Sequence, residues 1–417
     1  MNLPITQQLG TGNITANGMR MHFMLGSQLR MNYPSIFQKQ FSPYDAEIFT
    51  SSVQRTIQSA HAHLLGMYPL GTGEQMTIPN NSPFGLPPWQ GLSVSFSNFS
   101  ALPRAYRPFP YQTMTPDIDF FFFPSMFATC PNVDAQVKQE TKNLVNQYNY
   151  LVTDLSTQLI NAGFDPSTWY NQSTWTIDII ALFYDEMKSY LTYYGTYYNN
   201  LPEALFNKTY LIANLNFNFL FPQEKYFRMF ANGIGQDILS GLQAVVNGKS
   251  PKKFRMYSGH DTGVWAHMNL LNLTSRECLL DLIQTGSTTR PCQLMPDFAS
   301  SFLYELNTIG GSYYVRILLN GNPIAFCPGL ADPYNCPFNV FSSTFSNMVF
   351  FNGDFQAACG NTMLATYAKN NADHKPLVVT LVILLIVLAI SILSLLAFNF
   401  LTDGLRAKIK ERGMSAL

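Results

Sequence analysis

The chain contains few charged residues and no excess of either sign. Only 12% of its 417 residues are charged, and 25 basic side chains balance 25 acidic ones. This balance argues against the strongly basic composition that is typical of proteins that bind nucleic acids or other polyanions. The sequence also contains no zinc-type spacing of Cys and His, no G-x-x-x-x-G-K phosphate loop and no dinucleotide-binding fingerprint. We therefore expect no nucleic-acid partner, no metal and no organic cofactor.

The amino end contains no secretory signal, whereas the carboxyl end predicts a membrane anchor. Residues 1–10 include no apolar segment of the kind that starts translocation. Residues 377–401 form an apolar run of about 25 residues, which would extend roughly 37 Å as a helix and could cross a bilayer core of about 30 Å. A buried helix of a soluble domain is the alternative interpretation. The basic residues of segment 402–417 predict a cytosolic tail.

Sequons and cysteines favour a lumenal or extracellular location for the chain before this run. All six N-x-S/T sequons precede it, at Asn13, Asn80, Asn98, Asn171, Asn207 and Asn272. All six cysteines precede it too, and an even number is typical of an oxidising compartment: Cys130, Cys278, Cys292, Cys327, Cys336 and Cys359. We therefore predict a single-pass type I membrane protein of a lysosome-like or secretory compartment, or of the cell surface.

Residues 253–263 (KFRMYSGHDTG) combine a short apolar and aromatic run with small residues and a His-Asp pair. The run predicts a buried strand, and apolar residues at i, i+4 and i+7 from Val264 predict a helix after it. Open α/β sheets bind ligands at the carboxyl ends of their strands, and the N–H groups of a helix N-terminus favour an anion there. His260 and Asp261 are therefore candidate site residues, although many such pairs are only surface or capping residues.

An earlier helix supplies a candidate partner for this pair. Residues 46–49 predict a short strand, and the apolar residues that follow share one face of a helix. We expect Gly66 to end this helix. Arg55 stands in its first turn, and a guanidinium suits a phosphate or a carboxylate. A solvated arginine at the start of a helix is the alternative.

A further helix is predicted over about residues 13–34, near the amino end. Thr15 is its expected N-cap, and its inward face is expected to hold Met19, Phe23, Gly26 and Leu29. We expect the histidines of the two early helices to be packed side chains rather than ligands: His22, His61 and His63.

Together these stretches resemble the histidine acid phosphatase family, the second branch of the histidine phosphatase superfamily. Residues 51–66 match the family signature S-T-x-x-x-R-T-x-x-S-A-x-x-x-L-x-G, and residues 14–26 match its L-T-x-x-G-x-x-Q-H-x-x-L-G helix. Residues 110–131 and the segments after Asp297 are also similar to the family. The resemblance therefore extends over about residues 12–360.

The resemblance implies an α/β fold, a phosphoglycerate-mutase-like sandwich with a central mixed sheet flanked by helices. It implies the first part of this core in residues 1–133, a helical insert (cap) domain in residues 134–232 and the remainder of the core in residues 233–366. The short C-terminal bridge of the family implies a disulfide between Cys327 and Cys336. Cys130 with Cys359 is a reasonable second pair and would leave Cys278 with Cys292, but the sequence does not settle this connectivity.

The resemblance also implies roles for the candidate residues. In such enzymes the histidine of an R-H-G-x-R-x-P motif attacks phosphorus and forms a phosphohistidine intermediate. Arg55 and His260 would hold the phosphate, and Asp261 would protonate the leaving alkoxide. These roles are physically reasonable, because fixed cations stabilise the charge of phosphoryl transfer and a carboxylic acid can donate a proton below neutral pH.

The sequence departs from the family at one decisive point, because it contains no R-H-G-x-R motif. The first strand of the core and the nucleophile are therefore missing from the chain as written. One explanation is an incomplete amino end, with Met1 an internal methionine; the other is a catalytically silent homologue. We favour the first, because loss of one upstream segment would remove signal, strand and nucleophile together. We expect a membrane-anchored acid phosphatase that hydrolyses phosphate monoesters, and the alternative is an inactive glycoprotein that binds phosphorylated ligands or partners.

Overall fold

The computed structural model describes most of the chain between Gly12 and Asn361. The described residues are 12–37, 40–78, 82, 85–88, 90, 99–116, 119–122, 129–250, 252–349 and 355–361. The chain divides into two units, residues 1–360 and 361–417, and every described helix and strand belongs to the first. No helix in the described part is long and apolar enough to cross a membrane. The predicted span 377–401 and the predicted tail 402–417 lie outside the described residues.

A parallel sheet carries the two sequence motifs. Its strand order is β2 (Gln112–Thr113), β1 (Ala46–Thr50) and β3 (Phe254–Ser258). The side chains of β1 alternate between buried and half-buried, as expected for a strand with one face on a core. The register places Thr50 opposite Ser258, and the amide of Ser51 donates to the Ser258 carbonyl at 3.1 Å. β1 and β3 therefore leave the sheet at the same edge, and helices follow both.

An antiparallel sheet holds the later strands. β4 (Phe302–Ile309) pairs with β5 (Ser312–Leu319), which also pairs with β6 (Asn322–Ile324) and β7 (Cys336–Pro337). Gly310 and Gly311 connect β4 to β5 with φ of 58° and 82°, and Asn320 and Gly321 connect β5 to β6 with φ of 51° and 81°. Positive φ at both turn residues fits the right-handed twist of the flanking strands, so glycine and asparagine are favoured there.

The two sheets do not join, so the predicted central mixed sheet is divided. Among the described strands, β3 pairs only with β1, and β4 pairs with β5 alone. The second edges of β3 and β4 line one cavity of about 1160 Å³, together with apolar residues of the long helix α10 (Glu224–Val246). Strand edges present backbone N–H and C=O groups that a further strand can pair with. One strand between β3 and β4 would therefore join the sheets.

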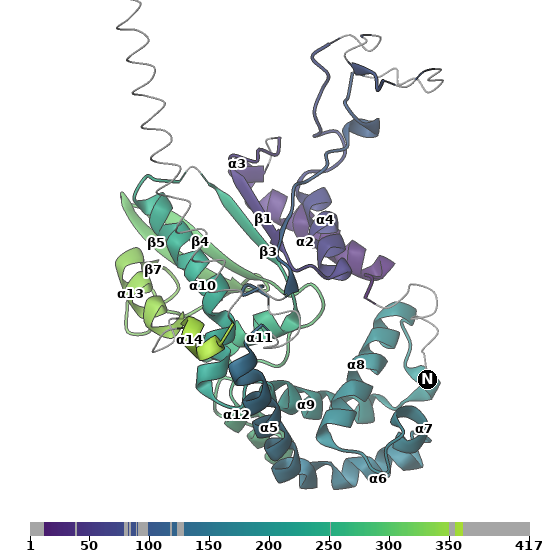
Figure 1. The fold of residues 1–417 in the computed structure, drawn as a ribbon. Helices are drawn as coiled ribbons and strands as arrows, with labels where there is room; N and C mark the ends of the chain where they lie inside the picture. The colour runs from purple at the N-terminus through teal and green to yellow at the C-terminus, as the bar shows by residue number, and fades with distance from the viewer. Residues whose placement is uncertain are drawn as a thin grey trace, which may run out of the picture. The chain divides into compact units, whose positions relative to one another are not determined.

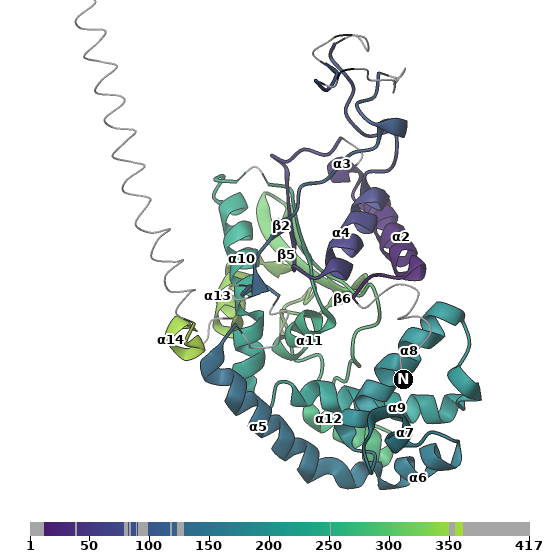
Figure 2. The same cartoon turned by 45° about the vertical axis from the view of Figure 1, so that its right-hand side comes forward.

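Helices lie on both sides of the sheets (Figures 1 and 2). On one side α4 (Gln54–Met67) packs on β1 and β3 and contacts α2 (Ala16–Asn32), which α3 (Pro34–Phe37) follows. On the other side lie α10 and α13 (Phe338–Val349), and α13 packs on β5. Figure 2 shows six further helices gathered into a separate helical region: α5 (Pro131–Tyr148), α6 (Thr153–Asn161), α7 (Pro166–Tyr170), α8 (Ile177–Tyr194), α9 (Glu203–Phe219) and α12 (Arg276–Thr285).

Glycine allows α2 and α4 to touch backbone to backbone. A Cβ atom on Gly26 would lie 1.9 Å from the carbonyl oxygen of His63, and one on Gly66 would lie 2.1 Å from the carbonyl oxygen of Phe23. The prediction that Gly66 ends its helix is wrong, because α4 continues to Met67. Gly66 is needed instead for the close approach of α2.

The amino end of α2 agrees with prediction, and its inward face agrees only in part. The hydroxyl of Thr15 accepts from the amide of Gly18 at 3.0 Å, which confirms the predicted N-cap. Gly26 and Leu29 are buried, but Met19 and Phe23 are 43% and 44% exposed, so the prediction for these two is wrong. Among the described residues, α2 packs mainly against α4 at the glycine contact. Only a narrow stripe of α2 is therefore buried.

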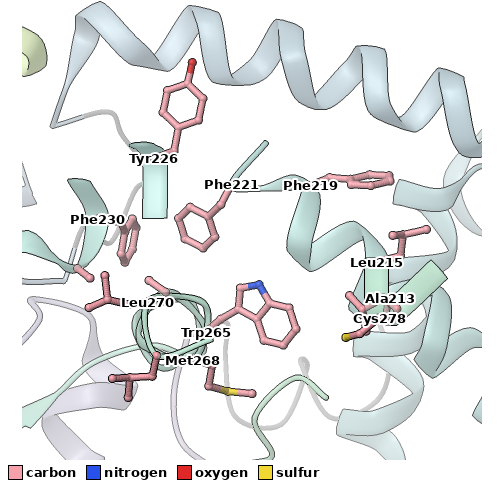
Figure 3. Close-up of a cluster of buried hydrophobic side chains, with 14 of the residues drawn as sticks. Ala213, Leu215, Phe219, Phe221, Tyr226, Phe230, Trp265, Met268, Leu270 and Cys278 are labelled. Atoms are coloured by element: carbon pink, nitrogen blue, oxygen red, sulfur yellow. The ribbon is translucent and has the colours of Figure 1, made fainter. Parts of the chain in front are cut away.

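The largest core fixes α11 (Asp261–Leu270), the helix that follows the His-Asp motif. Trp265 is fully buried, and its ring centroid lies 5.6 Å from that of Phe217 on α9. Figure 3 shows Trp265 among aromatic and aliphatic side chains that include Leu270 of α11 and Phe221 of the loop between α9 and α10. This dense packing holds the part of α11 from Trp265 to Leu270, directly after the first turn that carries Asp261.

Three disulfides connect the described residues. They join Cys130 to Cys359, Cys278 to Cys292 and Cys327 to Cys336, the same pairs that were considered from the sequence. The first links positions that are 229 residues apart and ties the start of α5 to α14 (Phe355–Cys359). Disulfides of this kind are typical of lumenal and extracellular domains.

Candidate active site

The edge where β1 and β3 end brings the early and late motifs together. Arg55 lies in the first turn of α4, and its backbone N–H donates to the carbonyl of Gly12 at 3.0 Å. His260 is the N-cap residue of α11, and Asp261 is the first residue of that helix. All three residues line the same cavity of about 1160 Å³, which continues between β3 and β4. Residues that are more than 200 positions apart in sequence thus share one wall.

A chain of hydroxyl groups holds the His260 imidazole. Its Nε2 lies 3.0 Å from Oγ of Ser51, and this hydroxyl lies 2.8 Å from Oγ1 of Thr56 on α4. Burial lowers the pKa of His260 to about 4, and the positive charge of Arg55 acts in the same direction. The imidazole is therefore neutral near neutral pH, and an anion bound between Arg55 and His260 would favour its protonation.

Asp261 has the properties of a proton donor. It is accessible to solvent from the cavity, yet protein atoms surround it on the other sides. This desolvation raises the pKa of Asp261, although the Thr262 amide, which donates to Oδ1 at 2.8 Å, and the charge of Arg55 act in the opposite direction. A carboxyl group with a raised pKa retains its proton at higher pH and can deliver it to a leaving group.

Asp185 of α8 is a further cavity residue that no motif in the sequence singles out. It lies among the aromatic residues of the helical region, and its neighbour Phe183 is buried core. Desolvation raises the pKa of Asp185 to about 6, with further contributions from the charges of Asp261 and Glu186, while Arg55 lowers it. Asp185 is therefore electrostatically coupled to the groups at the edge of the parallel sheet.

The three histidines of α2 and α4 lie in different surroundings. His63 is 6% exposed, and burial together with the nearby His22 lowers its pKa to about 3. His22 lies in the cavity wall, and its ring centroid is 6.2 Å from that of His63. His61 lies elsewhere, with its Nδ1 2.7 Å from the Tyr111 hydroxyl. Within the described residues, no group of three or more His, Cys, Asp or Glu side chains is arranged to hold a metal ion.

Comparison with known proteins identifies relatives along most of the chain. The family model described as "Histidine phosphatase superfamily (branch 2)" matches residues 3–320. Lysosomal acid phosphatase of Xenopus laevis is 24% identical over 263 residues, which cover 62% of this chain and 53% of the relative. Prostatic acid phosphatase of Mus musculus is 22% identical over 356 residues, which cover 81% of this chain and 79% of the relative. The matched part of the chain thus spans about half the length of the Xenopus protein.

Solved structures show the same fold. The phytase from D. castellii has a TM-score of 0.56 at 14% identity, covering 86% of this chain and 70% of that chain. The apo form of Hafnia alvei phytase has a TM-score of 0.53 at 13% identity, covering 86% of this chain and 90% of that chain. These likenesses confirm the predicted α/β class of fold and, at such low identity, carry no information about substrate.

Proposed function

This chain belongs to the histidine phosphatase superfamily, branch 2, and we propose that it is an acid phosphatase that hydrolyses phosphate monoesters. The observation that carries this proposal is that Arg55, His260 and Asp261 line one cavity at the carboxyl edge of the parallel sheet. A guanidinium and an imidazole can hold the phosphoryl oxygens there, and a carboxyl group with a raised pKa can protonate the departing alkoxide. The acid phosphatases among the relatives support the same reaction class.

The reaction through a phosphohistidine intermediate needs a nucleophilic imidazole beside these groups. The resemblance assigns that role to an R-H-G-x-R segment that follows the first strand of the core. We propose that such a strand lies between β3 and β4, because the free edges of both strands line one cavity. His267 supports this proposal: it is 5% exposed, it lines the cavity, and its Nε2 has no hydrogen-bond partner in the described part of the chain.

The cellular setting that we propose is a lumenal or extracellular one, with a single membrane span at residues 377–401. The three disulfides support an oxidising compartment. The names of the relatives, lysosomal and prostatic acid phosphatase, agree with this setting. The apolar composition of residues 377–401 carries the anchor proposal by itself.

One sequence observation favours a second function. The chain as written contains no R-H-G-x-R motif, so a protein of this sequence alone would hold phosphorylated ligands or partners without hydrolysing them. Arg55, His260 and Asp261 would then form a binding pocket rather than a catalytic site.

The test compares the chain with and without an added strand. The chain alone should bind inorganic phosphate but release none from p-nitrophenyl phosphate. The same chain preceded in frame by an apolar strand that ends in R-H-G-x-R should release phosphate, with an optimum on the acidic side. Equal inactivity of both forms, with phosphate binding retained, would favour the second function. Failure of both to bind phosphate would overturn the proposed site.

A further inference from the structure

One face of α8 lines the same cavity as the proposed phosphate site. Tyr184, Asp185, Lys188, Ser189 and Thr192 recur at the three- and four-residue spacing that places side chains on one side of a helix. Tyr184 is itself fixed, because it is 5% exposed and stacks on Tyr210 of α9 with ring centroids 5.1 Å apart. A phosphate ester bound at Arg55 therefore has the side chains of α8 available to its leaving group.

The basic residues of the cavity are almost all paired. Lys188 forms an ion pair with Asp297 at 2.8 Å. At the other end of the cavity, Glu47 lies 3.5 Å from Lys252 and 2.8 Å from Arg255, and Asp45 lies 3.2 Å from Lys253. Arg55 is the one lysine or arginine of the cavity wall that forms no ion pair with a described residue. The described cavity therefore offers one unpaired cation for a phosphate.

Asp185 is the acidic residue that α8 contributes to the cavity wall. Its carboxylate faces the solvent of the cavity and makes no hydrogen bond or ion pair with any described residue. The charges of Arg55 on α4, Asp261 on α11 and Glu186 on α8 itself all act on it. Glu186 points elsewhere, because it accepts a hydrogen bond from the Tyr170 hydroxyl at 3.0 Å. Lys188, one turn along α8, is already held by Asp297.

We propose that Asp185 is a specificity residue that selects monophosphate esters whose leaving group carries a protonated amine, and that it disfavours esters with several phosphates. This inference rests on the phosphatase site proposed above. When the phosphate of an amino-alcohol ester binds Arg55, its ammonium group can donate to the carboxylate of Asp185. A second phosphate in the same position would instead meet the negative charge of Asp185.

The experiment measures binding rather than turnover, so it does not depend on the nucleophile. Isothermal titration calorimetry near neutral pH would compare three probes: O-phosphoethanolamine, ethyl phosphate and inositol hexakisphosphate. We expect O-phosphoethanolamine to bind roughly tenfold more tightly than ethyl phosphate, the scale of one hydrogen bond to a charged group. Asp185→Asn should reduce this ratio to about one and should improve the binding of inositol hexakisphosphate severalfold.

The variant carries its own control against damage to the fold. Loss of structure would weaken all three probes, whereas loss of selectivity leaves ethyl phosphate bound at least as tightly as before. Asp178→Asn, an exposed position on α8 that does not line the cavity, should leave every affinity unchanged. An unchanged ratio in Asp185→Asn would overturn the specificity role while leaving the phosphate site intact. Absence of binding by all three probes to the unmodified chain would overturn the phosphate site and this inference together.

Discussion

Replacement of Gly66 by alanine should both destabilise the protein and displace Arg55. The new Cβ would lie 2.1 Å from the carbonyl oxygen of Phe23 and 2.7 Å from the amide nitrogen of Ser27. Ordinary contact begins near 3.4 Å, so α4 would have to move away from α2 by more than about 1 Å. Forced overpacking of this kind costs about 3 kcal/mol or more because both obstructing atoms are backbone. Arg55 moves with α4, so phosphate affinity should fall as well.

The assay is thermal unfolding followed by calorimetric titration with inorganic phosphate. We expect Gly66→Ala to lower Tm by roughly 5 °C or more. Gly263→Ala in α11 is the matched control, because a Cβ there would meet no atom of the described residues within 4 Å and its φ is not in the left-handed region. That change should leave Tm unchanged or raise it slightly, since alanine favours helix by up to about 1 kcal/mol over glycine. An equal Tm for Gly66→Ala and the unmodified chain would refute the backbone contact.

Further predictions concern three individual residues and one disulfide. Arg55→Lys should weaken phosphate binding about tenfold or more in calorimetry, because lysine cannot supply the paired donors of a guanidinium; unchanged affinity would exclude Arg55 from the site. In a form that hydrolyses phosphate esters, Asp261→Asn should lower kcat by orders of magnitude with little effect on binding, and a wild-type kcat would exclude the proton-donor role. Burial lowers the pKa of His63 from 6.5 to about 3, so the unfolded chain binds the proton more readily and stability should fall as pH drops through this interval. Urea unfolding at two pH values should show a smaller fall for His63→Gln, and an equal fall would contradict this origin. Cys130→Ser with Cys359→Ser, which opens a 229-residue link, should destabilise the protein by about 3–5 kcal/mol in urea unfolding, and an unchanged midpoint would contradict that contribution.

Those parts of the site that depend on local sequence could be predicted. Arg55, His260 and Asp261 each stand where a short strand gives way to a helix, and parallel strands bring such junctions to one sheet edge. The order of the motifs was therefore enough to predict that they meet. Their roles remain proposals, because position alone does not establish chemistry.

Asp185 could not be predicted, because its position in the cavity depends on how α8 folds back toward the sheet. In sequence it is one acidic residue on an aromatic helix, and nothing local distinguishes it from Asp178 on the same helix. Gly66 was misinterpreted for a similar reason. A glycine near the end of a helical pattern predicts a C-cap, but here the approach of α2, a long-range contact, decides its role.

The class of the fold was predicted from the sequence, but the arrangement of its sheets was not. The resemblance to the family implied the α/β class, and the likeness to solved structures confirms it. The division into a parallel and an antiparallel sheet could not be seen from periodicity, because β3 and β4 have the same sequence pattern whether or not another strand lies between them.

The most direct test is a crystal structure of the chain with inorganic phosphate bound. We expect one phosphate at the carboxyl edge of the parallel sheet, with the Arg55 guanidinium and the His260 imidazole on its oxygens and Asp261 beside it. Phosphate bound elsewhere, or contacted by only one of the two motifs, would contradict the claim that the early and late parts of the chain form a single site.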